Sequence, residues 1–203
     1  GQPKDCDDGN PCTTDSCGVD GCEYVAGDVA SCVLWEAQLT GFISGPPTLT
    51  SDDTVYVAAN MLTAISSSDG SVLWESTDVV DCTSPSPSIS LDGESLYIGD
   101  VDSEGKARLS SVATTNGTLK WEYPVGVGDK CKPGPNDPCR IPSIPTCTDS
   151  AVYIATQSAG VYAVSFDGKS YWHQGQALGI GRSAVVSSNT GNFYIGLYSG
   201  EEK

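Results

Sequence analysis

Residues 52–76 read DDTVYVAANMLTAISSSDGSVLWES, and this stretch decides the fold. Two short apolar runs, at 55–59 and 62–65, precede an Asp69-Gly70 pair, and a further apolar run carrying Trp74 follows it. An Asp-Gly pair between apolar runs is a strong β-hairpin pattern, because a type I′ turn needs positive φ at both central residues. The stretch therefore predicts consecutive antiparallel strands.

The same pattern recurs along the chain. Three glycines that each follow Asp or Asn stand four residues before a tryptophan: Gly70 before Trp74, Gly117 before Trp121, and Gly168 before Trp172. Apolar runs of the same kind each carry one tyrosine: Tyr56, Tyr97, Tyr153 and Tyr194. Self-similarity at a spacing of about 40–50 residues indicates a repeat protein.

A segment rich in proline and serine precedes three of these tyrosines: SGPPTLT, SPSPSIS and IPSIPTC. Each full repeat then has four strands, namely the Pro/Ser strand, the tyrosine strand, a strand of small apolar residues and the tryptophan strand. Complete units lie at about 41–77, 82–124 and 140–174. No stretch shows a sustained helical period, so almost no helix is expected. Four antiparallel strands in each unit predict an all-β fold of β-propeller-like blades.

The order of these strands resembles the quinoprotein-type (PQQ-like) repeat family. The motif stands here as TVYVAANMLTAISSSDGSVLWE, LYIGDVDSEGKARLSSVATTNGTLKWE and AVYIATQSAGVYAVSFDGKSYWH. The resemblance spans roughly residues 23–203. It implies that the tryptophans pack between neighbouring blades, a role that suits a large apolar ring with one N–H to satisfy. The tryptophans in question are Trp35, Trp74, Trp121 and Trp172.

The pattern is divided at the two ends of the chain. Two apolar runs at about 180–187 and 192–198, the latter with Tyr194, correspond to the first two strands of a blade. Residues 23–37, with a Gly27-Asp28 turn and Trp35, correspond to the last two. Three arrangements remain open: the half blades meet within one chain, they meet between chains, or the sequence is part of a propeller of seven or eight blades. Unpaired strand edges favour association, so half blades left open in solution are disfavoured.

Residues 1–22 form a separate cysteine-rich module, and residues 23–203 form the blades. The module has no hydrophobic periodicity, so disulfides must replace a core. Its spacing, C-x5-C-x4-C-x4-C, resembles the CTDC-type cysteine-rich repeats of secreted proteins, which implies an extracellular location. The chain holds nine cysteines and one histidine, so disulfides in an oxidising compartment are favoured over a metal–thiolate site.

Six cysteines are assigned to disulfides, with the connectivity left open: Cys6, Cys12, Cys17, Cys22, Cys131 and Cys139. The odd total leaves at least one thiol free or paired between chains. Cys131 and Cys139 lie in the insertion 126–140, which is either a stapled surface loop or a protruding contact loop.

The chain is strongly acidic, with a formal net charge of −16. Nucleic acid is therefore excluded as a partner, because phosphate binding needs a basic face. No apolar run is long enough for a membrane span. The charge favours solubility through self-repulsion, and a calcium-containing environment is the alternative.

Two groups of oxygen ligands are candidates for calcium, and solvated turns are the alternative for both. The first comprises Asp5, Asp7, Asp8, Asn10 and Asp15 in the cysteine-rich module. The second, Asp100, Asp102 and Glu104, resembles the opening of an EF-hand loop but has Ser111 at the twelfth position.

The sequence Asn116-Gly117-Thr118 matches the N-glycosylation pattern, although Asn-Gly also suits the turn predicted there.

Catalysis is not expected. A quinoprotein dehydrogenase would need calcium ligands, a tryptophan under the cofactor and often adjacent cysteines, and the chain has no adjacent cysteines. Its tryptophans are already explained by packing, and a full enzyme ring would need about twice this length. His173 alone supports neither a two-histidine metal site nor a catalytic triad. No cofactor is expected other than the candidate calcium.

The sequence thus predicts a non-enzymatic, secreted structural or interaction protein. Its half blades are completed by strand pairing, between subunits, to give an assembly or fibre. Two alternatives remain open: a glycan- or ligand-binding propeller closed within one chain, and a fragment of a PQQ-dependent dehydrogenase.

Overall fold

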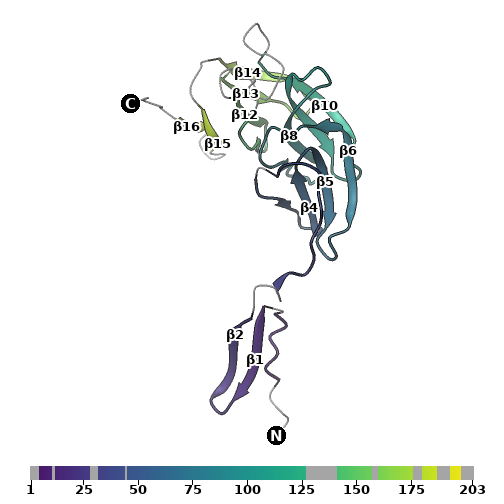
Figure 1. Cartoon of the computed structure of the whole chain (residues 1–203). Helices are drawn as coiled ribbons and strands as arrows, with labels where there is room; N and C mark the ends of the chain where they lie inside the picture. Colours follow the sequence, from purple (N-terminus) through teal and green to yellow (C-terminus); the bar gives the residue numbers. More distant parts are fainter. Residues whose placement is uncertain are drawn as a thin grey trace, which may run out of the picture. The chain divides into compact units, whose positions relative to one another are not determined.

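The computed structural model describes residues 5–10, 12–27, 32–43, 45–126, 141–156, 160–175, 180–186 and 193–197. The chain divides into two compact units, Gly1–Gln38 and Leu39–Lys203. In the described ranges all of the secondary-structure elements are β-strands, as the sequence predicted (Figure 1).

The first unit is a disulfide-stapled hairpin. Strand β1 (Thr13–Gly18) pairs antiparallel with β2 (Gly21–Ala26) across a tight turn. Most of its residues are exposed, so it contains little apolar core. Two disulfides, Cys6–Cys22 and Cys12–Cys32, supply the constraint that a core would otherwise provide.

The hairpin differs from the prediction for residues 23–37. Glu23–Ala26 pair with Thr13–Ser16, and the described residues 32–38 around Trp35 contain no strand. The division between units therefore falls after Gln38 rather than after Cys22. The physical reason is proximity, because β1 is only a turn away and Cys6–Cys22 ties the N-terminal segment to the start of β2. Among the described residues of 23–37, the only strand is the part of β2 that pairs with β1.

The second unit contains three successive four-stranded blades at the predicted places, although the last strand of the first blade runs to Val80, beyond the predicted end at about residue 77. Blade 1 is β3 (Thr48–Leu49), β4 (Thr54–Ala58), β5 (Met61–Ser66) and β6 (Val72–Val80). Blade 2 is β7 (Ser88–Ile89), β8 (Ser95–Val101), β9 (Ala107–Ala113) and β10 (Leu119–Pro124). Blade 3 is β11 (Thr146–Cys147), β12 (Val152–Thr156), β13 (Gly160–Val164) and β14 (Ser170–Gln174). All neighbouring strands are antiparallel, and one residue pair between β6 and β8, Val80 opposite Val101, joins blades 1 and 2 into a single eight-stranded sheet.

A row of three residues crosses each blade and explains its sequence pattern. In blade 1, Tyr56 is opposite Ala64, and Ala64 is opposite Trp74. The small side chain between them lets the two rings meet, with centroids 5.7 Å apart. Blades 2 and 3 repeat the row with Ser111 or Ala163 in the middle, and their ring centroids are 5.8 and 6.0 Å apart. The aromatic pair needs a small residue on the third strand.

The hydrophobic cores lie between blades. One buried cluster joins blades 1 and 2 through side chains such as Tyr56, Leu62 and Leu96. A second joins blades 2 and 3 through Tyr97, Leu109 and Ile154. Each blade is therefore stabilised by the blade next to it.

The tryptophans of blades 1 and 2 each contact the glycine turn of the following blade. Trp74 Nε1 donates a hydrogen bond to the carbonyl of Thr114 at 2.9 Å, and a Cβ on Gly117 would lie 2.5 Å from the indole ring. Trp121 Nε1 donates to the carbonyl of Phe166 at 2.7 Å, and Gly168 lies against that ring in the same way. Trp74 and Trp121 thus lie between neighbouring blades.

Proline explains why the first strand of each blade is short. Pro has no N–H for a ladder, so β3, β7 and β11 each span only two residues. Serine and threonine hydroxyls supply other contacts. Thr48 Oγ1 donates to the carbonyl of Pro87 in blade 2 at 2.6 Å, and Ser84 Oγ accepts from the Gly99 N–H at 3.0 Å.

The segment after blade 3 forms a two-stranded sheet, as predicted. Strand β15 (Ile180–Val186) pairs antiparallel with β16 (Phe193–Leu197), and Tyr194 is opposite Val185. Within the described residues this sheet has two strands, whereas each blade has four.

Replacing Gly117 tests the interblade contact. The variant Gly117→Ala places a methyl group against Trp74 and puts an L-residue at φ +72°, whereas Gly93→Ala meets only the strain of φ +76°, with nothing within 4 Å. Left-handed backbone costs an alanine about 1–2 kcal/mol, and overpacking adds about 1–3 kcal/mol. Urea unfolding should therefore show a clearly larger loss of stability for Gly117→Ala. Equal losses would contradict the contact.

Replacing Arg108 tests the buried ion pair inside blade 2. Asp100 is fully buried, and Arg108 Nη2 lies 2.9 Å from Asp100 Oδ2. The variant Arg108→Met leaves this carboxylate buried without its cation, which costs about 3–5 kcal/mol. The control Lys106→Met removes only an exposed pair with Glu104 and should leave the urea midpoint unchanged.

The loss in Arg108→Met should depend on pH. Burial raises the pKa of Asp100 from its usual value of 3.8 to about 6 in the folded state. The folded protein therefore holds this proton at pH values where the unfolded chain has released it, and the stability gained from the proton is lost as the pH rises through 6. Without the cation the pKa rises further, and the deficit should be smaller at about pH 5 than at about pH 8. A deficit equal to that of Lys106→Met at both pH values would contradict the role of the pair.

Candidate functional site

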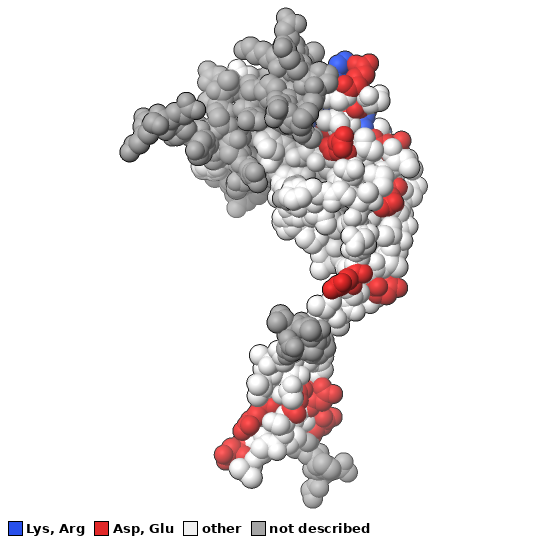
Figure 2. Space-filling view, in the orientation of Figure 1, with Lys and Arg blue, Asp and Glu red and all other residues white. Residues whose placement is uncertain are grey.

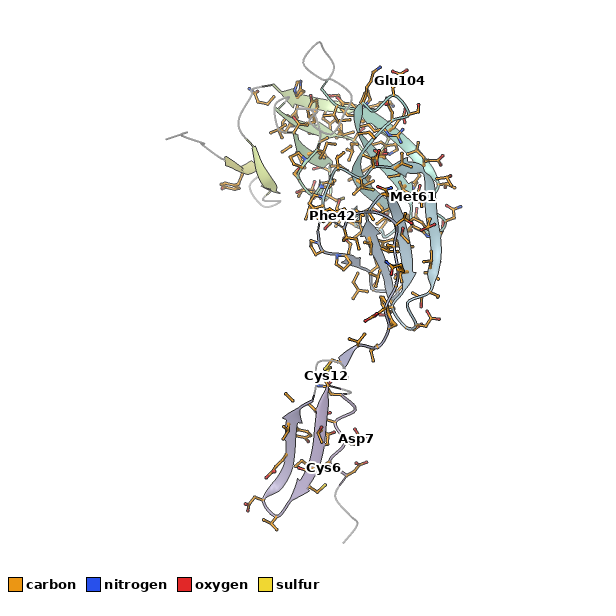
Figure 3. All side chains as sticks on the ribbon, in the orientation of Figure 1. Cys6, Asp7, Cys12, Phe42, Met61 and Glu104 are labelled. Atoms are coloured by element: carbon orange, nitrogen blue, oxygen red, sulfur yellow. A yellow bond between two sulfur atoms is a disulfide. The ribbon has the colours of Figure 1, made fainter. Side chains whose placement is uncertain are left out.

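The first calcium candidate is partly assembled in the hairpin unit. The carboxylates of Asp7, Asp8 and Asp15 offer oxygens that lie within 4.8 Å of one another. Asp15 Oδ2 accepts from the Asp8 N–H at 2.9 Å, and Asp15 Oδ1 is shielded from solvent. Asp5 and Asn10 instead accept hydrogen bonds from the backbone of Asp7 and Cys12. The three clustered carboxylates have the oxygen chemistry for a calcium ion, and Asp7 lies near Cys6 in the hairpin unit (Figure 3).

The structure does not bring the second calcium group together. Asp100 is buried and accepts from Arg108 Nε, Arg108 Nη2 and Ser110 Oγ. Asp102 Oδ1 accepts from the Glu104 and Lys106 N–H groups, so it shapes the turn. Glu104 pairs with Lys106 in that exposed turn (Figure 3). The three carboxylates thus have separate roles: Asp100 pairs with a buried arginine, Asp102 shapes the turn, and Glu104 pairs with a lysine at the surface.

The cysteines pair differently from the sequence grouping. Cys6, Cys12 and Cys22 form disulfides, with Cys32 as the partner of Cys12. Cys32 was missed because it lies ten residues beyond the cluster. Cys17 is exposed on β1, opposite Cys22 in the strand register. Cys131 and Cys139 lie outside the described residues.

Two free thiols lie in the blades. Burial raises the pKa of Cys82 to about 12, and burial also raises the pKa of the half-buried Cys147. A thiol that stays protonated is a poor nucleophile. These positions are therefore suited to packing.

His173 and Asn116 take local roles. The imidazole of His173 stacks on the ring of Tyr162, with centroids 4.0 Å apart, at the exposed strand β14. Asn116 Oδ1 accepts from the Thr118 hydroxyl at 2.9 Å in an exposed turn. The stacked histidine contributes to packing within blade 3. Asn116 remains a candidate for glycosylation.

The turns at one end of the blades form a continuous surface. We call it the turn face: 50–53, 66–71, 90–94, 113–118, 148–151 and 165–169. Antiparallel strands place both turns of a blade at the same end, and the Ser67 N–H donates to the Asp53 carbonyl at 3.0 Å between two of them. The Thr114 hydroxyl likewise donates to the Gly93 carbonyl at 2.9 Å. The face therefore runs across all three blades.

Two hollows lie side by side on the turn face. The first, of about 460 Å³, lies between blades 1 and 2 and is lined by 49–52, Tyr56 and 89–93. The second, of about 290 Å³, lies between blades 2 and 3 and is lined by 90–92, Tyr97 and Phe166 among others. The segment 90–92 borders both. Burial raises the pKa of Tyr56, and raises that of Tyr97 to about 12, so both phenols stay protonated.

Serine, threonine and lysine side chains lower the pKa of three carboxylates of this face, Asp52, Asp92 and Asp167. The Thr50 hydroxyl donates to Asp52 and lowers its pKa, and the Ser90 hydroxyl does the same for Asp92. Lys169, followed by the Ser165 hydroxyl, lowers the pKa of Asp167. Sequence reasoning missed this surface, although the recurring Ser/Thr-x-Asp spacing at the turns was a usable signal.

The part of the chain that the structure describes contains no helix long and apolar enough to cross a membrane. Acidic side chains are spread over the visible surface, and basic ones are few (Figure 2).

The fold matches a known propeller. The structure is similar to the crystal structure of BamB from Moraxella catarrhalis, with a TM-score of 0.54 and 20% identity. The match covers 74% of this chain and 42% of that chain, so this chain spans less than half of the length of its structural neighbour. No curated protein matches the sequence.

The family follows from a sequence comparison. The model described as "Outer membrane protein assembly factor BamB" (PQQ_2) matches residues 23–132. Residues 1–22 lie outside this match, and they contain Cys6, Cys12, Cys17 and Cys22. Because the match covers more than half of the chain, the chain belongs to the BamB-type family of PQQ-like β-propeller repeat proteins.

Proposed function

We propose that this chain is a non-enzymatic propeller that joins proteins outside the cytoplasm. Strands from another copy complete the blade that β15 and β16 begin. The printed name of the family, an outer membrane protein assembly factor, agrees with a role in assembly. The two disulfides of the hairpin favour an oxidising compartment, either the periplasm or the cell exterior.

The two-stranded sheet β15–β16 carries this proposal. The other blades of the second unit have four strands each, and the described residues supply only two here. A strand added beside β16 would gain a series of main-chain hydrogen bonds, and alternate side chains would set its register. Such an addition extends the architecture that the chain already uses three times.

The blades also show what a fourth blade needs on its other side. Trp172 occupies on blade 3 the position that Trp74 and Trp121 occupy on blades 1 and 2, beside the tyrosine of its own blade. Trp172 as a whole residue is 42% exposed. In the two described interfaces that position contacts a glycine turn of the following blade. By the same rule, a glycine turn of a complete fourth blade is expected beside Trp172.

Light scattering after size-exclusion chromatography tests the proposal. The wild-type protein should form a species larger than one chain that dissociates on dilution. The variant Tyr194→Lys places a charge on β16, where Tyr194 is 57% exposed, and should shift the protein towards the monomer. The matched control Tyr171→Lys changes a tyrosine that is 61% exposed on β14 and should leave the assembly intact.

Two outcomes would count against the assembly. One is a wild-type monomer at every concentration, which would favour a propeller closed within one chain or completed by a longer sequence. The other is an equal effect of Tyr194→Lys and Tyr171→Lys, which would show that β16 has no special part.

A further inference from the structure

Each blade exposes a large apolar side chain on the turn face or, for Leu49, directly beside it. Leu49, Leu91 and Phe166 are 64%, 75% and 43% exposed. Each of them lines one of the two hollows, and Leu91 lines both. Exposed apolar groups around a concave surface are typical of a binding site.

The two hollows form one site rather than two. They share the segment 90–92, and each is also lined by the buried tyrosine of its blade, Tyr56 or Tyr97. A ligand lying across this segment would contact blades 1, 2 and 3 in turn. The site therefore suits an extended chain better than a compact small molecule.

The charge of the face selects the partner. The six turns carry seven carboxylates: Asp52, Asp53, Asp69, Asp92, Glu94, Asp149 and Asp167. Lys120 and Lys169 are the cations beside them, and both are engaged: Lys120 Nζ donates to Ser95 Oγ, and Lys169 pairs with Asp167, each at 2.6 Å. Two copies of this face would repel each other. Its partner should be a different, cationic chain.

We propose that the hollows of the turn face bind an extended basic segment of a partner protein. Apolar side chains of that segment lie against Leu49, Leu91 and Phe166, while its Lys or Arg side chains meet Asp52, Asp92 and Asp149. This binding rests on the proposed role in joining proteins, but it uses a surface other than the edge of β16.

Fluorescence anisotropy with a defined probe tests the site. The probe is a labelled peptide that repeats lysine, leucine and serine, and its companion has glutamate in place of lysine. The full-length protein should bind the lysine peptide at least tenfold more tightly than the glutamate peptide. Added salt should weaken the binding, because part of the attraction is between exposed charges.

Matched double variants separate the site from general attraction to an acidic protein. Leu91→Ser with Asp92→Asn removes one leucine and one charge from the hollows, and asparagine can still accept the hydrogen bond from the Glu94 N–H. Leu73→Ser with Glu104→Gln removes the same groups elsewhere, since Leu73 is 53% exposed on β6 and Glu104 lies in the turn after β8. The first variant should weaken binding about tenfold, which corresponds to about 1.4 kcal/mol, and the second should not.

Three results would overturn the proposal: no binding by the wild-type protein, equal binding of the two peptides, or equal loss in the two variants. Light scattering on the same samples keeps the two ideas apart. Loss of peptide binding with an unchanged assembly state concerns the turn face alone, and loss of assembly with unchanged peptide binding concerns β16 alone.

Discussion

The contact between a tryptophan and the glycine turn of the next blade holds the second unit together. The indole N–H of Trp74 donates to the Thr114 carbonyl, and the indole ring covers Gly117. The Trp74 bond is partly buried, and a buried N–H without a partner costs about 1–3 kcal/mol, so the Thr114 carbonyl satisfies a donor that the packed ring partly shields from water. The same contact recurs between Trp121 and the Phe166–Gly168 turn. Neighbouring four-stranded sheets are thus stabilised by one another.

This constraint explains features that seem unrelated in the sequence. Ala64 must be small so that Tyr56 and Trp74 meet above it, and Gly117 must lack a Cβ so that the indole can approach. Because the contact places the turns of successive blades next to one another, it also creates the turn face and its two hollows. Packing and binding surface have a common origin.

The sequence predicted the blades well because their pattern is local and repeated. The Asp/Asn-Gly turn, the tyrosine and the tryptophan located all three blades and the β15–β16 pair. It failed for residues 23–26, because a strand that can pair with a neighbour two residues of turn away gives the same apolar pattern as a blade strand. Nor could it show that Asp100 is buried and paired with Arg108, because spacing along the chain does not reveal burial. The contact proposed between Leu91 and a partner segment rests on the exposure of Leu91 beside two hollows, which the sequence pattern does not show.

Hydrogen exchange of the indole N–H groups tests the central contact most directly. In protein labelled with ¹⁵N-tryptophan, the Trp74 and Trp121 signals can be followed after transfer to heavy water. Both N–H groups should exchange only when the blades separate, at rates that follow the unfolding of the second unit. Exchange of either group as fast as that of a fully exposed indole would contradict the claim that the tryptophan-to-turn contact joins the blades.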